Sequence, residues 1–190
     1  MPRVEIFNRE QVVDQMIRVF HNNGYNGTSM QDLVDATDLN RSSLYNSFGN
    51  KLSIFLECLK IYQQKTNRQT STLLLKSNTA LEAIESIFRI DPNTDCSNNG
   101  CLISNCTSEM ANKEVNVNSF LKSNRDHMIS FIADIVTQGQ QEGSINKNKS
   151  PKAYALYLFS ALQGYRSTGI LLKDEKQLNS IINIILDHLK

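Results

Sequence analysis

The stretch that decides the fold runs from Gly24 to Lys51 and reads GYNGTSMQDLVDATDLNRSSLYNSFGNK. Thr28 and Ser29 are both good helix-capping residues, and Gln31 follows Thr28 by three positions, as in a capping box. The apolar positions that follow have helical spacing and are Met30, Leu33 and Val34. We therefore predict that a helix begins near Ser29.

A second short helix is predicted directly after a tight turn. Asn40 is its candidate N-cap, and Leu44 and Phe48 repeat four positions apart behind it. The turn contains Asp38, and aspartate is one of the few non-glycine residues that tolerate a left-handed backbone. Two short helices joined in this way are typical of a unit that presents one helix to the major groove of DNA.

The rest of the chain also has helical rather than strand-like periodicity. A supporting helix before the decisive stretch is predicted over Arg9 to Asn23, with Gly24 as its stop. Ser150 and Pro151 form an N-cap followed by proline at the first helical position. The other predicted helices cover Lys51 to about Arg68, Ala80 to Arg89, Cys101 to Ala111, Val115 to about Gln141, and a final segment from about Leu178 to Leu189. The fold class is therefore all-α.

At this point the sequence resembles a known family. The residues that carry the resemblance are Gly24-Tyr25, Thr28-Ser29-Met30, Asp32-Leu33, Ala36, Leu39, Leu44-Tyr45, Phe48 and Lys51. Together they resemble the N-terminal DNA-binding domain of the TetR/AcrR family of bacterial transcriptional regulators, over roughly residues 9 to 62. The resemblance implies a three-helix helix-turn-helix DNA-binding domain over residues 1–50 and a helical ligand-binding and dimerisation domain over 51–190, with about nine helices in all.

Charge sets a limit on how the chain binds DNA. The formal net charge is +1, and six acidic residues outnumber five basic ones between Met1 and Lys51. A DNA-binding domain usually carries a strongly basic stripe, which this chain lacks. We therefore expect modest non-specific affinity, with phosphate contacts made by a few placed cations, neutral donors and helix N-termini.

Composition points to a soluble protein of the cytoplasm. No apolar stretch is long enough to act as a signal peptide or to span a bilayer. Cys58, Cys96, Cys101 and Cys106 are then expected as free thiols. The three histidines show no metal-ligand spacing with these cysteines, so neither a metal nor a cofactor is expected.

The candidate DNA contacts cluster at the second short helix and at the start of the first. Arg41, Ser42 and Ser43 lie at the exposed start of the recognition helix, and arginine is the commonest reader of guanine; a phosphate contact is the alternative for Arg41. The resemblance assigns backbone contacts to Tyr45 and Lys51, whereas packing or capping would also explain several of these residues. The full set is Thr28, Ser29, Asn40, Arg41, Ser42, Ser43, Tyr45, Asn46 and Lys51.

The helix that begins at Pro151 is apolar around most of its circumference, so it must be covered on two sides, and the final helix also has a broad apolar face. The resemblance favours a homodimer formed through a four-helix bundle, and a simple monomer core is the alternative. The candidate interface residues are Leu158, Leu162, Tyr165, Ile181 and Ile185.

The segment between the DNA unit and these helices is predicted to enclose a mainly hydrophobic cavity for a small-molecule effector. Its candidate lining residues are Phe88, Cys101, Asn105, Phe120, Met128 and Tyr165. Gly100-Cys101-Leu102 resembles a segment that supplies an oxidant- or electrophile-sensing thiol in some family members. The alternative is a cysteine that serves as a small apolar residue, because no basic neighbour in the sequence lowers its pKa.

These patterns predict a ligand-responsive transcriptional regulator, a repressor released from a palindromic double-stranded operator by a small hydrophobic or electrophilic effector. Two alternatives remain open. One is a structural or protein-partnered DNA-binding protein without an effector. The other is a small helical thiol enzyme, although the sequence contains no accompanying catalytic motif.

Overall fold

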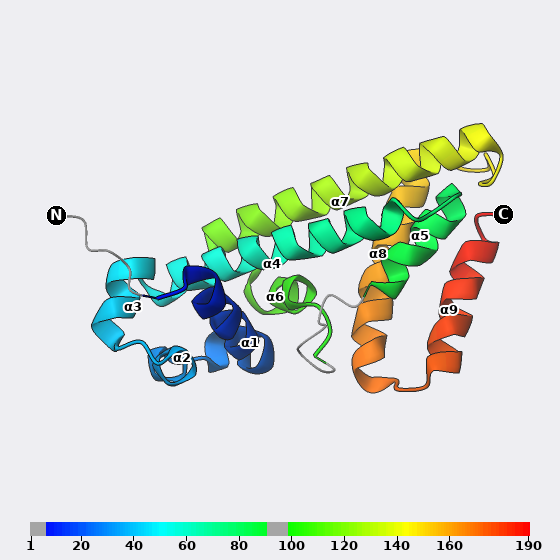
Figure 1. Cartoon of the computed structure of the whole chain (residues 1–190). Coiled ribbons are helices and arrows are strands. Elements are labelled where there is room, and N and C mark those ends of the chain that lie inside the picture. The colour runs from blue at the N-terminus through cyan, green and yellow to red at the C-terminus, as the bar shows by residue number, and fades with distance from the viewer. Residues whose placement is uncertain (1–6, 91–98) are drawn as a thin grey trace.

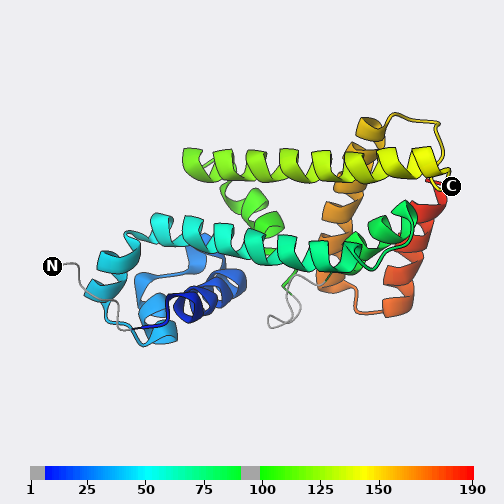
Figure 2. The same ribbon diagram turned by 45° about the horizontal axis from the view of Figure 1, so that its top comes forward.

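The computed structural model describes residues 7–90 and 99–190, and every regular element in these two ranges is an α-helix, as predicted. The helices are α1 (Arg9–Gly27), α2 (Met30–Thr37), α3 (Arg41–Phe48), α4 (Lys51–Leu74), α5 (Ala80–Arg89), α6 (Leu102–Met110), α7 (Val115–Glu142), α8 (Pro151–Leu171) and α9 (Glu175–Asp187). Figures 1 and 2 show an elongated molecule with α1 to α3 at one end, α8 and α9 at the other, and α4 and α7 running along its length. Cys96 lies outside the described residues.

The predicted caps place the first helices. Gly24 has φ 70° and ψ 175°, which interrupts α1 near its end, where the sequence predicts a stop. Ser29 caps α2 in a reciprocal capping box, but its partner is Asp32. The prediction of Gln31 was wrong, because the N-cap residue is Ser29 and the third helical position is therefore Asp32.

The turn between α2 and α3 has the predicted geometry. Asp38 adopts the left-handed conformation at φ 55°, and Asn40 caps α3 by accepting a hydrogen bond from the backbone N–H of Ser43. Leu44 and Phe48 are the buried residues of α3, so the rest of this short helix is left for other contacts.

Helix α4 extends beyond the predicted end near Arg68 to Leu74. Its last turns contain few apolar residues, so the sequence pattern gives no signal there. Thr66 and Thr70 are nevertheless buried, because their hydroxyls donate to the carbonyl oxygens of Tyr62 and Thr66 one turn earlier. Because their hydroxyls are hydrogen-bonded, these two threonines occupy buried positions of α4 where apolar residues would otherwise be expected.

The buried side chains form two clusters. The first joins α1 to α4 with α6 and the beginning of α7. The second joins α5, the second half of α7, α8 and α9.

The second cluster corrects the predicted dimer face. Leu158 and Leu162 are 1% exposed and Ile185 is 6% exposed within the single subunit, so these three side chains are core and cannot face a partner. Tyr165 and Ile181 are half-buried. The large apolar side chains that α8 and α9 leave exposed are Leu156, Tyr157, Leu171 and Ile184.

Candidate DNA interface and ligand cavity

The recognition helix α3 presents a polar face to solvent. Its core contacts come from Leu44 and Phe48 alone, so the remaining side chains point away from the cluster. Ser43 is half-buried, and the exposed residues of the cap and helix are Asn40, Arg41, Ser42, Tyr45 and Asn46. This arrangement brings most of the predicted DNA contacts onto one short helix.

Thr28 and Lys51, which the sequence also places in the DNA set, are used inside the protein. Thr28 is 2% exposed, and its hydroxyl donates to the carbonyl oxygen of Gly24. The Lys51 ammonium donates to the carbonyl oxygens of Tyr25 and Thr28 at 2.9 and 2.7 Å, and lies 4.3 Å from the centre of the Tyr25 ring. Both side chains therefore fix the segment between α1 and α2, and only Ser29 of that segment's predicted contacts is exposed.

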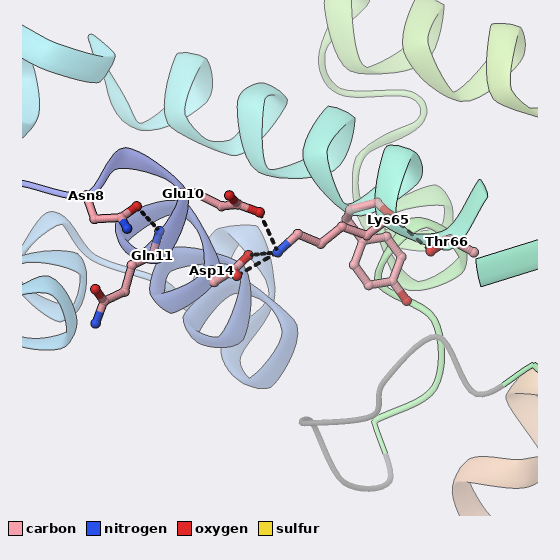
Figure 3. Close-up of polar contacts among 7 residues, drawn as sticks. Asn8, Glu10, Gln11, Asp14, Lys65 and Thr66 are labelled. Carbon is pink, nitrogen blue, oxygen red and sulfur yellow. Dashed lines mark hydrogen bonds and ion pairs between the residues drawn. The ribbon is translucent and has the colours of Figure 1, made fainter. Parts of the chain in front are cut away.

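Ion pairs at two residues of α4, Glu57 and Lys65, fasten α1 to this helix. The Arg9 guanidinium donates to both carboxylate oxygens of Glu57, at 2.9 and 3.0 Å, and to the carbonyl oxygen of Ser47 at the end of α3. Figure 3 shows the second of these points, where the Lys65 ammonium reaches both carboxylate oxygens of Asp14, at 2.6 Å each, and lies 3.8 Å from Glu10 Oε1. The DNA-facing helices are thus tied to α4 at two points along its length.

Helix α6 makes a separate connection to the same end of the molecule. The Glu109 carboxylate accepts the backbone N–H groups of Tyr25 and Asn26, at 2.9 and 2.7 Å. At the other end of the helix, His21 Nε2 lies 3.0 Å from the carbonyl oxygen of Gly100. A helix held at both ends against α1 can transmit a displacement to it.

A cavity of about 560 Å³ lies among α6, α7 and α8. Cys101 and Asn105 line it, as predicted from the sequence, together with side chains such as Phe159, Gln163 and Arg166. Met128 lines a smaller space of about 30 Å³ that shares Cys101 and Arg166 with the larger one.

Three of the predicted lining residues lie outside these two cavities. Phe88 and Tyr165 pack edge to face within the second cluster, and Phe120 packs against the first, so none of them lines either cavity. The surface of the larger cavity is mainly apolar, as predicted, and serine, asparagine, glutamine and basic side chains add polar groups to it. The segments that build the cavity are distant in sequence, which is why its polar groups have no local signal.

Cys101 is set apart from the other described cysteines by its neighbours. Burial raises the pKa of its thiol, but the Arg166 charge and hydrogen bonds from the Ser104 backbone N–H and the Tyr62 side chain outweigh that effect and leave the pKa below its ordinary value. Arg166 Nη1 lies 3.6 Å from the Cys101 sulfur. Burial raises the pKa of Cys106 to about 12 and also raises that of Cys58.

Arg166 is thus the basic neighbour that the sequence does not reveal. It is 65 residues away from Cys101 along the chain, so only the fold brings the two together. The expectation that nothing nearby lowers the thiol pKa was therefore wrong. A lowered pKa raises the ionised fraction of a thiol, and the thiolate is the nucleophilic form of cysteine.

Two searches of the described residues complete the description of the site. Within residues 7–90 and 99–190, no helix combines the length and apolar character that crossing a bilayer requires. In the same part of the chain, no three histidine, cysteine or carboxylate side chains gather as metal ligands would.

Comparisons with known proteins agree with this geometry. Residues 12–58 match the family model described as bacterial regulatory proteins, tetR family, and residues 80–185 match that of the tetracyclin repressor-like C-terminal domain. The chain is 24% identical over 182 residues to the HTH-type transcriptional repressor DhaR of Mycobacterium sp. (strain GP1), covering 95% of this chain and 91% of DhaR. It is 36% identical over 89 residues to the uncharacterized HTH-type transcriptional regulator YezE of Bacillus subtilis (strain 168), covering 47% and 46% of the two chains.

Solved structures share the whole fold. A cysteine mutant of the TetR family transcriptional regulator CifR, complexed with 26-base-pair operator DNA, superposes with a TM-score of 0.84 at 20% identity, covering 99% of this chain and all of that one. The reduced form of NemR from E. coli superposes with a TM-score of 0.82 at 16% identity, covering 96% and 97% of the two chains.

Proposed function

Because the chain belongs to the TetR family of bacterial regulatory proteins and is a DNA-binding transcriptional regulator, we propose that it is a homodimeric repressor that a small effector releases from a palindromic operator. The observation that carries this proposal is that α3 presents a polar, exposed face in a unit whose helix α1 is bonded to both α4 and α6. Residues 1–50 contact DNA in this proposal, and residues 51–190 bind the effector and the second subunit.

The proposed DNA contacts fall into two groups. Arg41 reads a base edge at the start of α3, with Ser42 and Asn46 beside it, because side chains at the N-terminal end of a recognition helix reach into the major groove. Tyr45 and Ser29 contact the sugar-phosphate backbone. The remaining members of the predicted set, Asn40, Ser43, Thr28 and Lys51, support these contacts by capping and by holding the loop.

The proposed subunit contact uses the exposed apolar face of α8 and α9. Leu156, Tyr157 and Ile184 are exposed, and Tyr165 and Ile181 are half-buried. Exposed apolar side chains on two helices that contact each other favour a protein interface. A two-fold dimer would present two copies of α3 in opposite orientations, which requires an operator with two inverted half-sites.

The proposed effector site is the cavity beside α6. A ligand there favours one position of α6 over another, and Glu109 and Gly100 carry that preference to α1. An electrophile would act covalently: the Cys101 thiolate sulfur forms a bond to the β-carbon of an unsaturated carbonyl compound, the double-bond electrons shift to the α-carbon, and that carbon takes a proton from water. Since the operator is bacterial chromosomal DNA, the proposal places the protein in the cytoplasm.

The test measures binding of the full-length protein to the DNA upstream of its own gene by fluorescence anisotropy. We expect a protected inverted repeat in a footprint, and release when an electrophile such as a quinone modifies Cys101. A coupling of about 1–3 kcal/mol corresponds to a loss of affinity of about 5- to 150-fold. Tight binding to a single asymmetric half-site by monomers would contradict the proposal. The proposal would also be contradicted if modification of Cys101 in the cavity left DNA binding unchanged.

A further inference from the structure

The cavity beside α6 is lined by positive charges without a lining carboxylate. Lys122, Arg125 and Arg166 contribute to its wall, and no aspartate or glutamate is among its described lining residues. Arg125 pairs with Asp126, which lies outside the lining. Even with Cys101 as a thiolate, three cations against two anions leave the site with one net positive charge in a chain whose total is only +1.

Arg166 is the cation best placed to meet a ligand. It is half-buried, and among the described residues no carboxylate pairs with it. Its hydrogen bond to the Cys101 sulfur uses one N–H at 3.6 Å. A guanidinium carries five donors in a planar fork, so the other N–H groups can take a carboxylate or phosphate oxygen.

The neighbouring amide is also oriented as a donor. The Ser104 hydroxyl donates to Gln163 Oε1 at 2.6 Å, which occupies the acceptor end of that side chain. The amide nitrogen of Gln163 makes no hydrogen bond to any described residue, and Gln163 lines the cavity one helical turn before Arg166. Adjacent donors without acceptors fit an oxyanion rather than a neutral apolar ligand.

We propose that the effector of this site is a small anion bearing a carboxylate or phosphate group, with Arg166 as its principal receptor and the Gln163 amide as a second donor. The proposal rests on the proposed function and narrows it to a chemical class of effector. An anion bound to Arg166 lies beside the Cys101 sulfur, so an anionic electrophile would be guided to the thiolate. An unreactive anion would shield it.

The test compares two alkylating reagents of nearly equal size that differ in charge, iodoacetate and iodoacetamide. With each reagent the Cys101 thiolate displaces iodide, so a carbon–sulfur bond forms and a carbon–iodine bond breaks. Mass spectrometry of the Cys101 peptide gives both rates on the full-length protein. Both reactions require the thiolate, so the ratio of the two rates is independent of the thiolate fraction and reports the charge selectivity of the cavity.

We expect the ratio of the iodoacetate rate to the iodoacetamide rate to fall by about tenfold in Arg166→Gln, because focused positive charge raises the local concentration of an anion by a factor of ten or more. Arg166→Lys should retain most of the ratio. Lys152→Gln is the matched control, since it removes one charge from the same helix about 21 Å away. A ratio unchanged in Arg166→Gln, or lowered equally in Lys152→Gln, would overturn the proposal, as would failure of both reagents to modify Cys101.

A second measurement avoids substitution at Arg166 and remains valid if that variant does not fold. Inorganic phosphate should slow the iodoacetamide reaction of wild-type Cys101, whereas sodium chloride at the same ionic strength should not. Equal slowing by the two salts would count against an anion site. Operator binding by the wild-type protein is measured separately. If the protein binds its operator but Arg166→Gln does not change the ratio of the iodoacetate rate to the iodoacetamide rate, only the anionic effector is refuted. Absence of operator binding refutes the proposed function.

Discussion

The carboxylate of Glu109 on α6 accepts a hydrogen bond from the backbone N–H of Tyr25 on α1, at 2.9 Å. The same carboxylate accepts the N–H of Asn26. These groups follow Gly24, where φ is 70° and an added Cβ would lie 2.9 Å from Glu109 Oε2. The kink in α1 therefore turns two donors toward one carboxylate, on a helix that also lines the candidate ligand cavity.

Replacing Glu109 with glutamine should weaken this contact, because the amide offers one acceptor oxygen in place of two and carries no charge. We expect the free energy of unfolding to fall by about 1–3 kcal/mol, measured by urea denaturation. We also expect that filling the cavity with a ligand changes operator affinity less in this variant than in the wild-type protein. Glu142→Gln, at the exposed end of α7, is the matched control. Equal stability of the two variants would show that the contact contributes nothing.

Arg41→Ala should cost about 1–3 kcal/mol of operator binding and relax the preference at one position in each half-site. Anisotropy titrations against a set of single-base operator variants measure both effects. If Arg41 contacts only phosphate, every variant will lose affinity by the same factor.

Lys51→Ala should behave differently from Arg41→Ala. Because its ammonium holds the carbonyl oxygens of Tyr25 and Thr28, its loss should lower the melting temperature and weaken binding to all operator sequences alike. Calorimetry and the same titrations check this. A change of base preference without loss of stability would instead place Lys51 in the groove.

The subunit interface can be separated from the core by two charge substitutions. Ile184 is 66% exposed, so Ile184→Glu should leave the subunit folded and shift sedimentation from dimer to monomer. Leu162 is 1% exposed, so Leu162→Glu should unfold the subunit by burying an unpaired charge. Leu75→Glu, at the exposed end of α4, is the control for added charge. A dimeric Ile184→Glu would move the interface to another face.

The reaction of Cys101 with iodoacetamide should depend on pH in a way that its neighbours set. The pKa of Cys101 is lowered, so the rate should rise and level off at a lower pH than for a free cysteine. Arg166→Gln removes the positive charge that lowers the pKa of Cys101 most, while the effect of burial stays. The rise in rate should therefore move to higher pH. Cys106, with a pKa of about 12, should stay unreactive below pH 9 and serve as the internal control. If the pH profile of the Cys101 reaction is the same in Arg166→Gln and in the wild-type protein, Arg166 is not the cause of the lowered pKa.

The local signals in the sequence proved the most reliable. The caps at Ser29 and Asn40 and the left-handed Asp38 depend on residues a few positions apart, so the two short helices and their turn could be predicted from the sequence. The end of α4 could not, because buried threonines replace the apolar pattern there.

Contacts between distant segments were predicted less well. On α8 and α9 apolar residues occur on several faces, and periodicity alone does not say whether Leu158 or Leu156 faces the core. The pairing of Cys101 with Arg166 joins residues far apart in the chain, so the basic neighbour of the thiol could be identified only from the fold.

The first buried cluster has a consequence for how regulators of this kind diversify. Phe55 and Leu59 of α4 and Leu102 and Met110 of α6 pack with the core of α1 to α3. A recombination event at residue 50 would separate α1 to α3 from much of the apolar surface that they pack against. These three helices, moved to another protein, would need α6 as well as α4 to stay folded. If α3 reads the operator as proposed, new operator specificities are more accessible through point substitutions on its exposed face than through exchange of whole modules.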